Sequence, residues 1–388
     1  MCRAPKLICN DRGMVLLTSL LILSLVVVAG LGARVMLQSD FKILANLRGG
    51  TEAFYLAEAG IEWGKDEISR SMTHPPNPTN RAQSFSSGTF SVAFISPTEV
   101  TSLISRIVVR STGIIGTSTQ TIQAQLTKTY DLADGAVGLR GNASRVGFSG
   151  NVFVSGVDHD PANGEAISES KPRTAISVSD AAIQELVEDA LRNTPAGNIT
   201  AGEGNPSAIA QTSFVPGQLV ASLGDELCGA THALTTFIPS EGMLSLTDQS
   251  WGSRSSPQLR CIEGLAGPGD SVNLGGNLSG VGILVVKNAE LVINGSFRWE
   301  GLVIVSGSSV GLRVVGEENK EIYGSLMVNE NGTPLATGIL DIGGAIRVLF
   351  SRPALGRAAT TIPSSTLQNA YSFLPSTVTQ NYWKTINP

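Results

Sequence analysis

The feature that most constrains this chain is an uncharged apolar run of twenty residues, Met14 to Ala33, close to the N-terminus. As a helix rising about 1.5 Å per residue, this run matches the roughly 30 Å hydrocarbon core of a bilayer. The short segment before it carries Arg3, Lys6 and Arg12. Positive charge beside a membrane span stays in the cytoplasm, so the sequence predicts a single-pass inner-membrane protein with a cytoplasmic N-terminus.

The boundary between residues 1–13 and the apolar run allows two interpretations. The apolar core is longer than that of a secretory signal, and no A-x-A cleavage site follows it. A small-residue step does occur at Gly13–Met14, on the cytoplasmic side, which is typical of a cleavable prepilin leader. The alternative is a signal anchor that tethers a periplasmic domain and is not cut there.

The residues after the apolar run keep a helical period. Gly49 and Gly50 predict a bend or local melting, because each Gly costs about 1 kcal/mol relative to Ala in a helix interior. The prolines that follow His74 should end the helix before them. A helix of roughly 55 residues would extend about 80 Å, so its exposed half needs partners. Steps of three, four and seven place these apolar residues on one face: Leu37, Phe41, Leu44, Leu47, Phe54 and Ile61.

The first seventy residues resemble the N-terminal domain of PilX-type minor pilins of type IV pili. The resemblance implies cleavage after Gly13 by a prepilin peptidase, methylation of the new N-terminus at Met14, and packing of the helix among other pilin subunits. It also implies transfer from the inner membrane to a periplasmic or extracellular fibre, with a tip adhesin or surface ligand as a further partner. Besides Gly13 and Met14, the residues that carry it are Ala45, Asn46, Arg48, Ala53, Phe54, Ala57, Glu58 and Ala59.

The fifth position after Gly13 is Thr18, where most pilins have Glu. A carboxylate inside a bilayer is costly unless it finds a partner, which in major pilins is the free amine of a neighbouring subunit. Thr18 cannot make that ion pair. A subunit without it has less need of a neighbour ahead of it, so we expect a position at or near the filament tip.

The four cysteines divide into two pairs. Cys2 and Cys9 lie in the leader, whereas Cys228 and Cys261 lie in the part that should face the oxidising periplasm. A disulfide closing a loop of roughly thirty residues would contribute about 3 kcal/mol. A metal pair is the alternative, but the nearest additional ligand is His232 and there is no C-x-x-C.

Length and charge set broad limits on function. The chain has 388 residues, enough for two or three domains, and a net charge of −5. Cleavage would remove three positive charges and one negative charge, leaving −7. Because no basic patch with interleaved aromatic residues occurs, we expect no nucleic-acid partner.

Alternating polar and apolar residues predict antiparallel strands within 85–95 and 107–126. Residues 110–113 should form a strand end and turn. With the transmembrane half of the helix at 14–33, the amphipathic helix and small sheet at 34–130 would form a compact pilin module.

Residues 131–388 predict a Gly-rich β domain. Gly282, Gly301 and Gly324 lie about twenty residues apart and each precedes an apolar strand, which favours a β-solenoid over an antiparallel β-sandwich. Residues 157–270 should be a less regular insert. It would contain a helix capped at Ser179–Asp180 and a loop over 194–217.

Catalytic signals are weak. Asp158-His159-Asp160 precedes a proline, and a polar turn explains it better than a metal or catalytic site. His74 and His232 have no nucleophile motif nearby. We therefore expect no enzyme, cofactor or metal.

The sequence as a whole predicts an α+β chain: a long N-terminal transmembrane and amphipathic helix with a small antiparallel pilin-like sheet, then a mostly β domain. The expected function is that of a structural minor pilin or pseudopilin. The alternative is a signal-anchored periplasmic β-solenoid protein that binds or cleaves polysaccharide.

Overall fold

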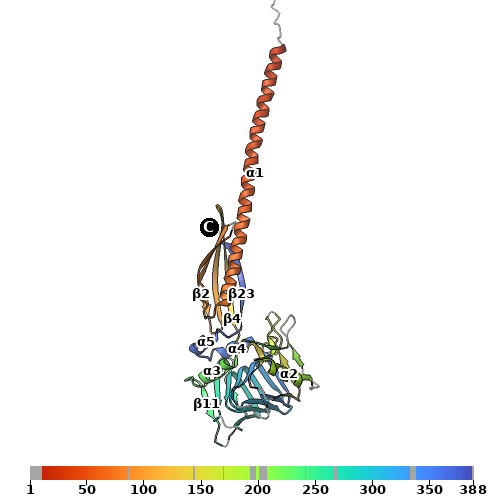
Figure 1. Ribbon diagram of the computed structural model, residues 1–388, viewed down its shortest axis with the longest axis vertical. Coiled ribbons are helices and arrows are strands. Elements are labelled where there is room, and N and C mark those ends of the chain that lie inside the picture. Colours follow the sequence, from red (N-terminus) through yellow and green to blue (C-terminus); the bar gives the residue numbers. More distant parts are fainter. Residues whose placement is uncertain are drawn as a thin grey trace, which may run out of the picture.

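The computed structural model describes residues 11–85, 88–142, 145–168, 170–192, 198–200, 208–240, 242–265, 269–332 and 338–386. A single long helix, α1 (Asp11–Arg70), rises out of the molecule. A small antiparallel sheet lies along its C-terminal half, and a large β region follows beyond the end of the helix (Figure 1). The chain is therefore α+β, as its sequence predicts.

Helix α1 runs without a break through Gly49 and Gly50, so the bend or melting expected there is wrong. These glycines mark the point where the helix first meets the sheet. A Cβ on Gly49 would lie 2.7 Å from the Ser118 hydroxyl oxygen. The missing side chain thus permits close packing, and it does not interrupt the helix. The helix ends at Arg70, before the prolines, as expected.

The small sheet pairs five strands in the order β1-β2-β3-β4-β23, all antiparallel. Residues 110–113 lie inside β3, so the strand end and turn expected there are wrong. Gly113 is needed for another reason: a Cβ there would lie 2.1 Å from the Ala53 carbonyl oxygen of α1. The strands are β1 (Arg81–Phe85), β2 (Gly88–Val100), β3 (Ile104–Ile115), β4 (Ser118–Tyr130) and β23 (Ser376–Ile386).

Strand β23 changes the domain boundaries expected from sequence. It pairs with β4 along Ser376–Ile386, so the C-terminal segment completes the sheet beside α1. The end of the chain consequently does not belong to the large β region, which is inserted between β4 and β23 of the small module. Figure 1 shows the C-terminus beside the helix, away from the large β region.

The large β region contains two sheets whose ladders are all parallel, which rules out the antiparallel sandwich. From β14 to β22 the chain alternates between the two sheets, and strands one circuit apart pair with each other. We call this region the parallel stack. The main path of its larger sheet is β10 (Ile209–Gln211), β8 (Thr174–Val178), β5 (Gly135–Gly141), β20 (Lys320–Glu330), β18 (Ser296–Gly307), β16 (Asn277–Lys287), β14 (Gln258–Glu263) and β11 (Leu234–Phe237).

The smaller sheet and four further strands complete the stack. Strand β13 pairs with β16, β22 pairs with β20 and β7, and β7 pairs with β9. These strands are β13 (Ser250–Trp251), β22 (Ile346–Phe350), β7 (Val152–Ser155) and β9 (Asn198–Thr200). The smaller sheet is ordered β12 (Met243–Thr247), β15 (Ser271–Gly275), β17 (Glu290–Asn294), β19 (Gly311–Val315), β21 (Leu340–Ile342) and β6 (Val146–Phe148).

The three periodic glycines lie in one row across the larger sheet. Gly282 pairs with Gly301, which pairs with Gly324. Their φ angles of 127°, 139° and 137° are ones that side chains rarely tolerate. A Cβ on Gly301 would also lie 1.9 Å from the Gly282 carbonyl oxygen. The glycine row therefore reflects a backbone requirement repeated in successive strands.

The segment 157–270 is more regular than expected, because strands β8 and β11 to β14 within it belong to the stack. The predicted helix is α2 (Ala181–Arg192), and the Asp180 carboxylate accepts hydrogen bonds from the amides of Ala182 and Ile183. A second helix, α3 (Gly217–Cys228), lies against β14, β16, β18 and β20. Two short helices, α4 (Arg352–Ala359) and α5 (Ser364–Ala370), lie near the junction with the small sheet (Figure 1).

Candidate functional site

The first candidate site is the N-terminal half of α1, which packs against no other element among the described residues. Every residue from Met14 to Leu47 is exposed, and the large apolar side chains there are 52–71% exposed. This helix alone among the described residues is long and apolar enough to cross a membrane, and its most apolar window is 0% buried. It therefore fits a membrane anchor.

Thr18 and the predicted processing residues Gly13 and Met14 lie near the start of α1. Gly13 and Met14 belong to the first turns of α1. The Thr18 hydroxyl donates a hydrogen bond to the Val15 carbonyl oxygen at 3.0 Å, within the helix. The Thr18 hydroxyl thus has a hydrogen-bond partner within its own helix and needs none from another subunit.

The motif residues singled out in the sequence divide between two environments. Ala53 and Ala57 are buried against the sheet, and Phe54 is half-buried. The remaining motif residues are exposed: Ala45, Asn46, Arg48, Glu58 and Ala59. Arg48 makes an exposed ion pair with Glu52 at 2.8 Å, which gives little stability on its own.

A shallow pocket separates α1 from the edge strand β23. Trp383 of β23 is 53% exposed, and its ring centroid lies 6.0 Å from that of Phe54. Ile61 and Ile122 form the floor with these aromatic rings, and Glu58 and Glu62 also line it. Trp383 was not expected from the sequence, although residues 376–386 are rich in the β-branched and aromatic residues that favour a strand.

Buried Lys128 fixes the C-terminal end of α1 to strand β4. Its ammonium group donates hydrogen bonds to the carbonyl oxygens of Ile68, Ser69 and Ser71, at 2.9, 3.1 and 2.6 Å. Ile68 and Ser69 belong to the last turn of α1, where the helix leaves carbonyls without an internal partner, and Ser71 directly follows the helix. Burial lowers the pKa of the Lys128 ammonium to about 8.

His74 lies between the small sheet and the parallel stack. Its ring contacts the rings of Tyr130 and Tyr371, at centroid distances of 5.4 and 4.6 Å. Nε2 donates to the Thr101 carbonyl oxygen at 2.6 Å, whereas the buried Nδ1 has no hydrogen-bond partner among the described residues. Burial lowers the pKa of His74, although the bond to Thr101 opposes this, and the charge of Lys128 lowers it further. His74 thus packs between two tyrosine rings at the junction of the small sheet and the parallel stack.

The Asp158-His159-Asp160 segment also serves the junction. Asp158 is buried and accepts hydrogen bonds from the Arg352 amide at 2.8 Å and the Ser170 hydroxyl at 2.6 Å. Asp160 accepts from the Ala162 amide in a turn. The His159 Nδ1 donates to a backbone carbonyl at 2.6 Å. No group of three potential metal-ligating side chains occurs among the described residues, and His232 bonds only a backbone carbonyl.

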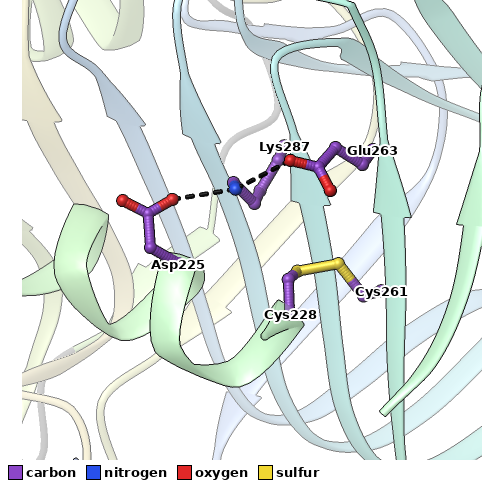
Figure 2. Close-up of a disulfide and its surroundings, with 5 residues drawn as sticks. All are labelled: Asp225, Cys228, Cys261, Glu263 and Lys287. Atoms are coloured by element: carbon purple, nitrogen blue, oxygen red, sulfur yellow. Dashed lines mark hydrogen bonds and ion pairs between the residues drawn. A yellow bond between two sulfur atoms is a disulfide. The ribbon is translucent and has the colours of Figure 1, made fainter. Parts of the chain in front are cut away.

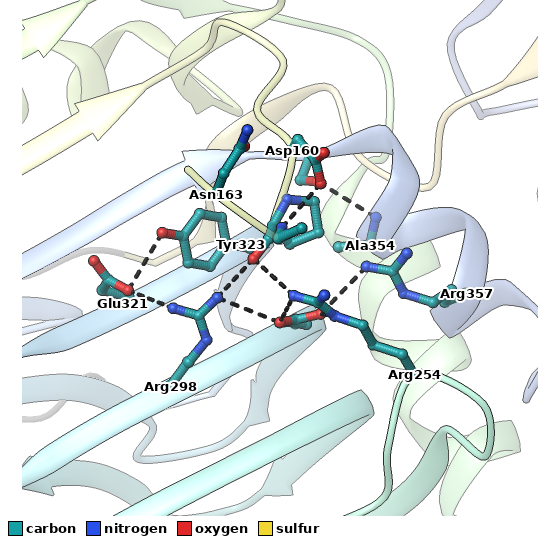
Figure 3. A network of polar contacts seen from close by, with 12 residues as sticks. Asp160, Asn163, Arg254, Arg298, Glu321, Tyr323, Ala354 and Arg357 are labelled. Carbon is teal, nitrogen blue, oxygen red and sulfur yellow. Dashed lines mark hydrogen bonds and ion pairs between the residues drawn. The ribbon is translucent and has the colours of Figure 1, made fainter. Parts of the chain in front are cut away.

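A second polar network surrounds Glu300 of β18, and Figure 3 labels its members Arg254, Arg298 and Arg357. Glu300, 5% exposed, accepts hydrogen bonds from Arg254 at 2.6 and 2.7 Å and from Arg357 at 3.2 Å. Arg254 and Arg298 also donate to the Pro161 carbonyl oxygen, at 2.8 and 2.6 Å. Burial raises the pKa of Glu300, but these hydrogen bonds and positive charges outweigh it and lower the pKa. The network holds the segment containing Pro161 onto the sheet.

The predicted disulfide is confirmed. Cys228 at the end of α3 is bonded to Cys261 of β14, with the Cα atoms 5.5 Å apart. Beside it, the Lys287 ammonium lies 2.8 Å from Asp225 and 2.9 Å from Glu263 (Figure 2). Both links attach α3 to the same end of the parallel stack.

No family model matches the chain, and no curated protein matches it. A similar solved structure is that of the competence-associated pilin ComZ from Thermus thermophilus, with 11% identity and a TM-score of 0.24. The match covers 87% of this chain and 97% of that chain. Values this low do not establish a common fold or function.

Proposed function

We propose that this chain is a structural minor pilin or pseudopilin of the PilX type. It would be inserted in the inner membrane, cut between Gly13 and Met14 by a prepilin peptidase, and methylated on Met14. The helix would then pack among other pilin subunits in a type IV pilus-like filament. The parallel stack would be a β-solenoid displayed outward, with no catalytic role.

The observation that supports this proposal most is the length of the exposed apolar helix. A bilayer covers about twenty helical residues, and Met14 to Ala33 already supply them. Leu37, Phe41 and Leu44 continue the apolar surface outside that span and are 57–68% exposed. A plain membrane anchor has no use for this second apolar stretch. Lateral packing with similar helices would bury it.

The inserted stack supports a rare, terminal position. Residues 131–375 contain the large β region, which lies beyond the C-terminal end of α1 and is much wider than the helix (Figure 1). Repeated copies along a shaft would crowd each other there. Together with Thr18, which needs no partner ahead of it, this favours a place at or near the tip.

The test is the mass of the chain in cells with and without the prepilin peptidase. The proposal predicts a product thirteen residues shorter when the peptidase is present, and the full precursor when it is deleted. Gly13→Leu should also leave the precursor uncut. Gly30→Ala is the matched control, since a Cβ there meets no atom within 4 Å, and it should be processed normally.

An uncut chain in wild-type cells, absent from sheared filaments, would contradict the proposal. That outcome would favour an anchored periplasmic protein acting on polysaccharide.

A further inference from the structure

The two ends of the parallel stack differ. At one end, α2 packs against β6 and β10 and buries Ile183 and Val187. At the other end, β11 and β12 are the last strands of their sheets. Stacked β proteins require a cap at each end, because the last circuit otherwise exposes its apolar layer and its backbone. The described residues provide that cap only at the α2 end.

The open end exposes apolar side chains. Six large apolar residues between 131 and 375 are exposed among the described residues; three of them lie on β11 and β12, and a fourth follows β14, the strand paired with β11. They are Leu234, Phe237, Met243 and Leu265, at 44%, 67%, 59% and 73% exposure. Leu244 and Leu246, which face the core, are only partly buried. The concentration of these side chains at one end indicates an interaction surface.

The backbone at this end is also unprotected. Edge strands usually avoid association through charged residues, prolines or bulges. The strands β11 (LTTF) and β12 (MLSLT) contain no charge and no proline, and both pair regularly with their inner neighbours. The Ile238 amide donates to the Glu263 carbonyl oxygen of β14 at 2.9 Å. Because strand amides alternate in direction, those of Thr235 and Phe237 point away from β14.

A partner must therefore supply two strand edges at the spacing of the two sheets, with apolar side chains between them. We propose that this partner is a second copy of the chain, bound end to end through β11 and β12. A two-fold axis perpendicular to both sheets would place β11 antiparallel to β11 of the second copy, and β12 antiparallel to β12 of the second copy. The same surface would thus satisfy both strand edges in both copies. The absence of charge removes electrostatic repulsion between the copies.

The disulfide and Lys287 suit this role because they make the open end rigid. Cys261 lies in β14, directly beside β11, and α3 is bonded to it (Figure 2). Rigid strands lose less entropy on association than loose ones. The inference does not depend on the proposed function, since it concerns only the stack.

Cysteine cross-linking of the full-length protein in detergent tests the proposal. In a Cys2→Ser, Cys9→Ser background, Ser245→Cys places a reporter in the middle of β12, and Glu185→Cys places a control on the exposed face of α2. A short bismaleimide should give covalent dimers for Ser245→Cys and none for Glu185→Cys. Association through α1 alone would bring neither position specifically to its copy, so it would give no preference for Ser245→Cys over Glu185→Cys.

Two disrupting variants are combined with the Ser245→Cys reporter. Thr235→Pro removes an outward amide but leaves the ladder to β14, and Phe237→Lys adds a charge to the edge. Each should lower the dimer yield about tenfold, because one lost hydrogen-bond pair or one buried charge costs more than 1.4 kcal/mol. Unchanged circular dichroism and an intact Cys228–Cys261 bond confirm folding.

Equal yields at the two reporter positions would overturn the proposal. Dimers that persist in both disrupting variants would also overturn it, as would cross-links only to a different protein. Failure of leader processing would leave it unaffected.

Discussion

At the scale of single residues, His74 couples the junction to pH. Its folded-state pKa is lowered, chiefly by burial, so the folded protein binds fewer protons than the unfolded chain below about pH 6.5. Protonation would place a second N–H at Nδ1, where no described acceptor is available. The stability that neutral His74 provides is therefore complete above the unfolded pKa and decreases as the pH falls below it. Urea unfolding between pH 5 and 8 should show this decrease, and His74→Phe should reduce it. An unchanged slope in the variant would contradict this assignment.

Lys128 makes a second prediction at this scale. Lys128→Met keeps the approximate length of the side chain but removes three hydrogen bonds to the end of α1. Loss of these bonds should cost about 2–3 kcal/mol of unfolding free energy. Lys384, in the exposed edge strand β23, is the matched control, and Lys384→Met should change stability by less than about 0.5 kcal/mol. Similar losses in the two variants would refute a capping role for Lys128.

At the scale of elements, glycines on α1 determine how closely the helix approaches the sheet. A Cβ on Gly60 would lie 2.1 Å from the Ser111 hydroxyl oxygen, whereas one on Gly50 would meet only a flexible Gln120 nitrogen at 3.9 Å. Gly60→Ala should therefore destabilise the module by about 1–3 kcal/mol through overpacking. Gly50→Ala should stabilise it by up to about 1 kcal/mol, because helix propensity then acts alone. Thermal unfolding of the two variants measures both effects, and equal shifts would contradict the close-packing account.

The same elements show what the sequence could predict. The apolar run, the end of α1 before the prolines, the Asp180 cap of α2 and the disulfide follow from local chemistry and are present. The roles of Gly49 and Gly113 do not follow from helix propensity or turn preference, because they depend on packing neighbours: the Ser118 side chain lies close to Gly49, and the Ala53 backbone lies close to Gly113. The pairing of β23 with β4 joins residues about 250 positions apart, and no local pattern specifies that partner.

At the scale of the whole molecule, three parts follow one another. An exposed apolar rod leads to a helix-backed sheet, and an inserted parallel stack lies beyond it (Figure 1). Lys128, His74 and the buried ion pairs of Asp131 with Arg173 and Arg352 all lie where these parts meet. Force or association at the rod would thus reach the stack through a polar junction.

The central claim is that the exposed apolar helix packs against other helices outside the membrane. The most direct measurement is photo-crosslinking in living cells from Leu44, which lies beyond the membrane span and is 61% exposed. Arg70, at the end of the helix and also exposed, is the matched control position. The account predicts that Leu44 yields adducts with the N-terminal helix of another pilin subunit and that Arg70 does not. Adducts with lipid alone, or none at either position, would contradict it.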